Sequence, residues 1–200
     1  MYWKMKEFDI AYEKAELVLK EMNYKKDRMI PTATIIDTVE KMLKVDVRFA
    51  LYDFTKLSSA MPGKKINLDD YGAAMAVDNN RVNILLNENE TPEMQRFSLV
   101  HELGHLMTQK EVVTQPYRVS THIDMDITSI PKEILENPKY KFLVNEQIAN
   151  IFALLVLMPY EMLVDAMKKQ DSFEDVAKFF GVNECALDSR LQLKDAEKVN

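Results

Sequence analysis

The stretch RFSLVHELGHLM, residues 96–107, constrains the fold of this chain more than any other. Thr91 followed by Pro92 predicts a helix start, because threonine caps the free N–H groups of a first turn and proline is favoured at the first helical position. His101 and His105 are therefore expected on one helix, four residues apart. Residues at this spacing share a helix face, so both imidazoles should point toward whatever packs beside that face.

The two histidines and Glu102 form the pattern HExxH, which is typical of a zinc site. His101 and His105 can each offer one nitrogen to the same ion, whereas Glu102 is offset and suited to take a proton from a water that zinc has acidified. The alternative is a helix with two ordinary buried histidines. With average compositions, a chance HExxH in a chain of this length has a probability on the order of one per cent, which favours the metal site.

Gly104 lies inside the same predicted helix, between the two histidines. A glycine in a helix interior costs about 1 kcal/mol relative to alanine, so it needs a structural reason. Close approach of another element near the site is the reason that we expect.

A catalytic zinc site has three protein ligands, so a third must lie elsewhere in the chain. The pattern HExxHxxGxxH is excluded, because positions 108 and 111 hold Thr108 and Glu111. Glu146 is one candidate: it begins a stripe of small and polar residues at helical spacing that would let another helix approach closely. This stripe comprises Glu146, Ala149, Asn150 and Ala153. The alternative is that Glu146 is the solvated edge of a buried helix.

Further polar residues compete for roles at the site. His122, close to Asp124 and Asp126, could be the third ligand, a transition-state donor or a surface histidine. Tyr117 and Tyr140 are candidate hydrogen-bond donors to a tetrahedral intermediate. Asn150 is a candidate for supporting the ligands or the transition state. The sequence does not choose among them.

Periodicity predicts an α+β fold that is mainly helical, with a small antiparallel sheet of about three strands and HExxH on a central helix. Strands are expected over 45–54, 71–78 and 81–87, and a long irregular loop over 110–136. Helices are expected over 5–22, from Pro31 to residue 43, from Pro92 through HExxH, and over 137–158, 160–169, 173–180 and 183–193. Residues 1–30 should form a helix packing on a main domain of residues 31–200, as one structural unit.

Composition narrows the class of protein. The 200 residues are 47% hydrophobic, with no secretion signal or membrane span that we can recognise, so we expect a cytoplasmic protein. The single Cys185 fits a reducing compartment. Helices over about 160–195 have a helix-turn-helix outline, but the net charge of −6 argues against direct nucleic-acid binding and for a packing role.

HELGH followed by EQIANIFALLVLMP resembles the ImmA/IrrE family of zinc metallopeptidases, as does the tail DVAKFFGVNECALDSRLQL. The resemblance implies a zincin-like domain with gluzincin-like ligands, in which His101, His105 and Glu146 bind one zinc ion per chain and Glu102 is the catalytic base. Family members typically cleave a helix-turn-helix repressor and so regulate transcription, often from mobile genetic elements. A zinc-containing module that binds a repressor without cutting it is the alternative function.

One departure from the family concerns the spacing of the two motifs. Residues 106–145, 40 in all, separate His105 from Glu146, which is longer than the family pattern implies. We therefore expect an insertion over 111–136, with consequences for substrate access and selectivity.

Overall fold

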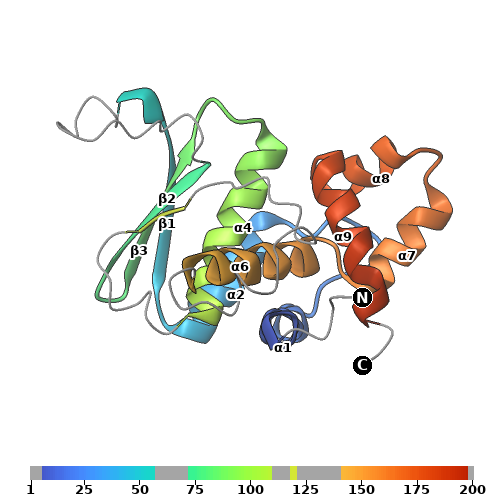
Figure 1. The fold of residues 1–200 in the computed structure, drawn as a ribbon, viewed down its shortest axis with the longest axis horizontal. Coiled ribbons are helices and arrows are strands. Elements are labelled where there is room, and N and C mark those ends of the chain that lie inside the picture. The colour runs from blue at the N-terminus through green and yellow to red at the C-terminus, as the bar shows by residue number, and fades with distance from the viewer. Residues whose placement is uncertain (1–5, 57–71, 110–117, 121–140, 198–200) are drawn as a thin grey trace.

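The computed structural model describes residues 6–56, 72–109, 118–120 and 141–197. Figure 1 shows a sheet at one side of the molecule and helices layered behind one of its faces. In chain order the elements are α1 (Lys6–Met22), α2 (Thr32–Leu43), β1 (Asp46–Tyr52), β2 (Ala73–Asp78), β3 (Arg81–Asn87), α4 (Pro92–Thr108), β4 (Arg118–Ser120), α6 (Lys141–Leu157), α7 (Tyr160–Lys169), α8 (Phe173–Phe180) and α9 (Glu184–Glu197). The α+β class expected from the sequence is confirmed.

The sheet differs from the expected antiparallel one. Its four strands lie in the order β1-β3-β2-β4, and β1 runs parallel to β3. The hairpin of β2 and β3 forms as expected, with Asn79 in the left-handed conformation at its turn. β1 pairs with β3, the second strand of that hairpin, and runs in the same direction. Periodicity identifies strands but not their partners, so this pairing was not visible in the sequence.

Part of the segment expected to be an irregular loop is a strand. Residues 118–120 form β4, which pairs antiparallel with β2 at the edge of the sheet. Three residues are too few to show an alternating pattern, and only the neighbouring strand reveals the pairing.

The helix boundaries follow the local signals closely. The Thr91 side chain accepts a hydrogen bond from the backbone N–H of Met94, and α4 begins at Pro92 as expected. Gly181 ends α8 in a left-handed conformation with φ of 62°. Pro31 is the N-cap of α2 and not its first residue, so the helix begins at Thr32, one residue later than expected. The expected start of α6, at residues 137–138, lies outside the described residues.

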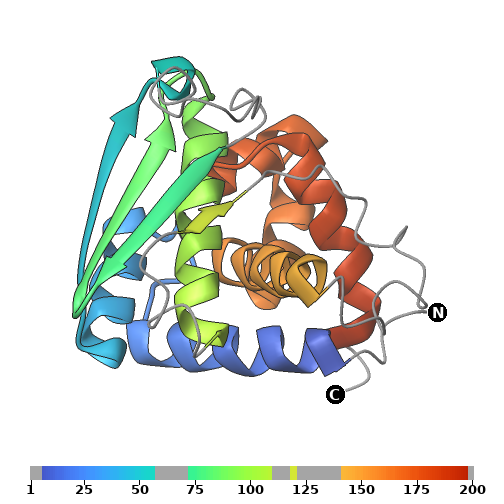
Figure 2. The same cartoon turned by 60° about the vertical axis from the view of Figure 1, so that its left-hand side comes forward.

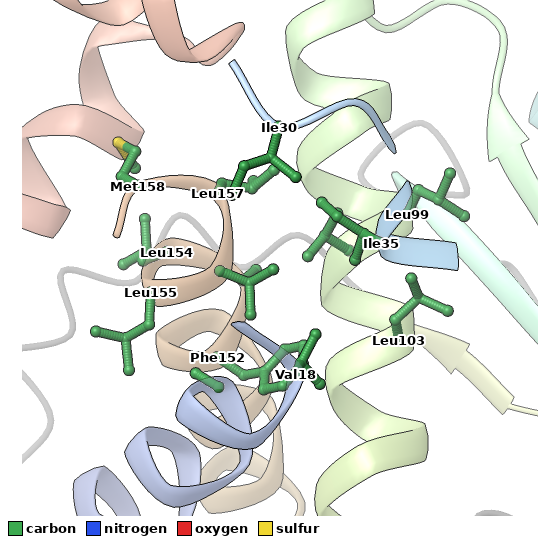
Figure 3. Packing of buried hydrophobic residues seen from close by; sticks show 14 of the residues in the cluster. Val18, Ile30, Ile35, Leu99, Leu103, Phe152, Leu154, Leu155, Leu157 and Met158 are labelled. Carbon is green, nitrogen blue, oxygen red and sulfur yellow. The ribbon is translucent and has the colours of Figure 1, made fainter. Parts of the chain in front are cut away.

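Helix α6 is the centre of the core. Every residue from Ile151 to Met158 is buried, and Figure 2 shows α6 almost end-on beside α4, with α1 running across below both. Figure 3 shows buried side chains from α1, α2, α4 and α6 meeting in this core. Among the described residues no single helix is long and apolar enough to span a membrane, and α6 with α7 meets those criteria only as a pair bent by 57°.

The C-terminal helices belong to the same core. Leu187 and Leu193 of α9 are buried in the cluster that contains α6. Arg190 is also fully buried, and its Nε donates to the carbonyl of Met158 at 2.9 Å. The guanidinium of Arg190 therefore serves the packing of α9 and lies away from the surface.

Candidate metal centre

The crossing of α4 and α6 brings together three side chains that can bind a metal ion. His101 and His105 lie one turn apart on α4, and their Nε2 atoms are 2.9 Å from each other. Glu146 reaches in from α6, with Oε2 3.2 Å from His101 Nε2 and Oε1 3.4 Å from His105 Nε2. The three donor atoms all lie within 4.8 Å of one another.

Gly104 makes this crossing close. An added Cβ at this position would lie 2.9 Å from Cδ1 of Phe152 and 3.1 Å from the carbonyl oxygen of Ala149. The expectation that another element approaches at Gly104 is confirmed, and that element is α6. A side chain here would separate the helices that carry the three donors.

The donors are buried, which raises the energetic cost of leaving them uncompensated. His101 is 2% exposed, His105 is fully buried and Glu146 is 8% exposed. Glu146 is thus within the core and not on a solvated edge of α6. Two imidazole nitrogens and a carboxylate oxygen are a donor set that zinc prefers, so these residues fit that ion.

Burial and charge oppose each other in the pKa values of this cluster. Burial acts to lower the pKa of His101, but hydrogen bonding to the Glu146 carboxylate and its charge outweigh burial and raise that pKa. Burial acts to raise the pKa of Glu146, but the two histidines hold it well below its usual range. The cluster therefore favours a negative carboxylate facing positive charge.

Each histidine ring is held at its other nitrogen by an amide side chain. Oδ1 of Asn150 lies 2.7 Å from Nδ1 of His101, so the Nδ1–H can donate to it, which leaves Nε2 available to a metal ion once Nε2 has lost its own proton. The side-chain amide of Gln109 lies 2.6 Å from Nδ1 of His105. Asn150 was a candidate from the sequence. Gln109 was missed, although its position four residues after His105 places it on the same helix face.

Glu102 is fully buried beside His101, outside the group of three donors. Its charge contributes to the raised pKa of His101, which places the carboxylate within electrostatic reach of the ring. This position suits proton transfer next to a bound ion better than ligation of it.

The remaining candidates fall outside the described residues. His122, Tyr117 and Tyr140 all lie in the segments 110–117 and 121–140, and so does Glu111, whose carboxylate would be an alternative third ligand to Glu146. The donor group on α4 and α6 is formed without them.

The chain was also compared with known proteins. A model of the IrrE N-terminal-like domain, peptidase family M78, matches residues 57–192. This match includes α4 and α6 with all three donors, and most of the C-terminal helices. No curated protein matches the chain.

Proposed function

Because the chain belongs to the IrrE N-terminal-like family of M78 peptidases, we propose that it is a zinc-dependent endopeptidase that cleaves a regulatory protein. The family assignment confirms the resemblance inferred from the HELGH and EQIAN motifs. The observation that carries the proposal is the buried convergence of His101, His105 and Glu146 on one point.

The number of ligands favours a catalytic over a structural zinc ion. Structural zinc sites are usually closed by four protein ligands, whereas catalytic sites have three and keep one position open. Among the described residues, the cluster offers three donors, His101, His105 and Glu146. We therefore assign one zinc ion per chain in a gluzincin-like HExxH...E arrangement.

Glu102 is the general base in this proposal. When bound, zinc supplies Lewis-acid chemistry, polarising a peptide carbonyl and lowering the pKa of water to about 7. Glu102 takes the proton of the attacking water on its carboxylate and passes it to the leaving amine. Its complete burial keeps bulk water from competing for that proton. Asn150 orients His101 through the ring N–H at Nδ1.

The substrate that we propose is a helix-turn-helix transcriptional repressor in the cytoplasm. The motif resemblance supports it, because that family typically cuts such repressors. The net charge of −6 also supports it, since an acidic protein attracts the basic surface of a DNA-binding partner.

Glu102→Gln tests the catalytic assignment. The amide cannot accept the proton, so we expect stoichiometric zinc by metal analysis and loss of repressor cleavage by on the order of 100-fold or more. Glu93→Gln, the same substitution in the first turn of α4, is the control and should cleave like wild type. Full proteolysis by Glu102→Gln would contradict the mechanism. An intact repressor in a stable complex with zinc-loaded wild type would replace it with a non-cleaving binding function.

A further inference from the structure

Gln109 occupies an unusual place at the end of α4. It is the C-cap residue, and its backbone N–H donates to the carbonyl of His105 at 3.0 Å. Its side chain turns back into the protein and is 9% exposed. The amide nitrogen lies 2.6 Å from Nδ1 of His105 and donates to the carbonyl oxygen of Asn145 at 3.3 Å. Gln109 thus links a histidine of the metal centre to the residue before Glu146.

A contact at Nδ1 of a neutral imidazole affects which of the two ring nitrogens carries the proton. Such a ring carries its single proton on one nitrogen and a lone pair on the other. An amide nitrogen facing Nδ1 donates to it, which keeps the ring proton on Nε2. An amide oxygen facing Nδ1 accepts from it, which keeps the proton on Nδ1 and leaves the Nε2 lone pair directed at His101 and Glu146. Only the second tautomer can bind a metal ion through Nε2.

We propose that Gln109 is a positioning residue that selects the metal-binding tautomer of His105 through its amide oxygen. The inference rests on the zinc site of the proposed function. A half-turn of the amide about its last bond exchanges nitrogen and oxygen, so that the oxygen accepts from Nδ1. This turn gives up the hydrogen bond from the amide nitrogen to the carbonyl oxygen of Asn145, at 3.3 Å. Gln109 then supports His105 as Asn150 supports His101.

Three variants separate this role from simple packing. Gln109→Glu has almost the same shape and can only accept at Nδ1, so we expect it to bind zinc at least as tightly as wild type. Gln109→Met fills similar volume without an acceptor, and we expect zinc affinity to fall about 10–100-fold. Gln170→Met is the matched control, because Gln170 is the C-cap of α7 and should leave affinity unchanged. Affinities are measured by competition with a chromophoric chelator.

A second measurement observes the tautomer itself. In metal-free wild-type protein, ¹⁵N NMR of the neutral imidazole ring of His105 should show its proton on Nδ1, and a proton on Nε2 would overturn the inference. Equal zinc affinity in Gln109→Met and wild type, or equally weak binding in Gln109→Glu and Gln109→Met, would overturn the inference. If Gln109→Met does not fold, the Gln109→Glu affinity and the wild-type tautomer decide it. A wild-type protein that binds no zinc would instead overturn the proposed function.

Discussion

His101 and Glu146 show how a buried ion pair can be stable without metal and still be ready for it. Their hydrogen bond and opposite charges outweigh the cost of burial, so the pKa of His101 rises and that of Glu146 falls. A divalent cation would replace the proton on His101 as the positive partner of the carboxylate. Protons and metal therefore compete for the same place.

This competition predicts a pH dependence of stability in protein treated with a chelator. The raised pKa of His101 contributes stability that is fully present below its ordinary value of 6.5 and lost as pH rises through the raised value. The lowered pKa of Glu146 contributes stability that is present above 4.5 and lost only as pH falls through the lowered value. We therefore expect the Tm of chelator-treated wild type, measured by thermal unfolding, to fall as pH rises above the ordinary histidine value of 6.5.

Glu146→Gln is the control for this dependence. The amide carries no charge, so the fall in Tm with rising pH should flatten in the variant. Subtracting the Tm–pH curve of the variant from that of wild type removes the contribution of titratable groups elsewhere in the chain. The same slope in both proteins would show that the His101–Glu146 pair does not titrate as described.

The packing of α4 on α6 shows why a costly residue occurs in a helix interior. Alanine at position 104 would normally stabilise a helix by about 1 kcal/mol. Here, two of the three nearest atoms to the added Cβ belong to the backbone of Ala149, at 3.1 and 3.2 Å, and the third is Cδ1 of Phe152. A ring can shift slightly, but backbone moves only with the whole of α6.

Gly104→Ala should therefore destabilise the protein. We expect a loss of about 1–3 kcal/mol in the free energy of unfolding, measured with urea, because overpacking outweighs the gain in helix propensity. Zinc affinity should also fall, since the two helices carry different ligands. A variant as stable as wild type would mean that α4 and α6 can separate at no cost.

Across the whole molecule, the candidate metal centre joins helices that build most of the core. Buried residues of α4 and α6 pack with α1, α2 and the sheet, and those of α9 extend the same cluster. An ion bound between α4 and α6 would therefore favour the folded state of the entire described structure. Binding energy at this site becomes folding energy.

Zinc should raise the stability of the folded protein. At a free concentration about 100 times its Kd, one bound ion adds about 2.7 kcal/mol to the free energy of unfolding. Differential scanning calorimetry of zinc-loaded and chelator-treated wild type should therefore show a higher Tm with zinc. Glu146→Ala should lose most of this difference. An undiminished zinc effect in that variant would move the third-ligand assignment to His122 or Glu111.

Local signals made much of the fold and of the candidate site predictable. Thr91, Pro92 and Gly181 act through backbone geometry within a few residues, so they indicated the start of α4 and the end of α8. The four-residue spacing of His101 and His105 likewise follows from helix geometry. Glu146 could be predicted from the sequence because α6 is apolar nearly all round, so an acidic residue within it stands out.

Other features depend on pairs of residues that lie far apart in the chain. The parallel pairing of β1 with β3 and the addition of β4 depend on which strand edges meet. The contact of Asn150 with His101 and that of Gln109 with Asn145 depend on how α6 crosses α4. Periodicity reports the face that a helix buries, but not the depth or angle at which two faces meet. Tertiary packing alone determined that Asn150 contacts His101 and that the Gln109 side chain reaches Asn145.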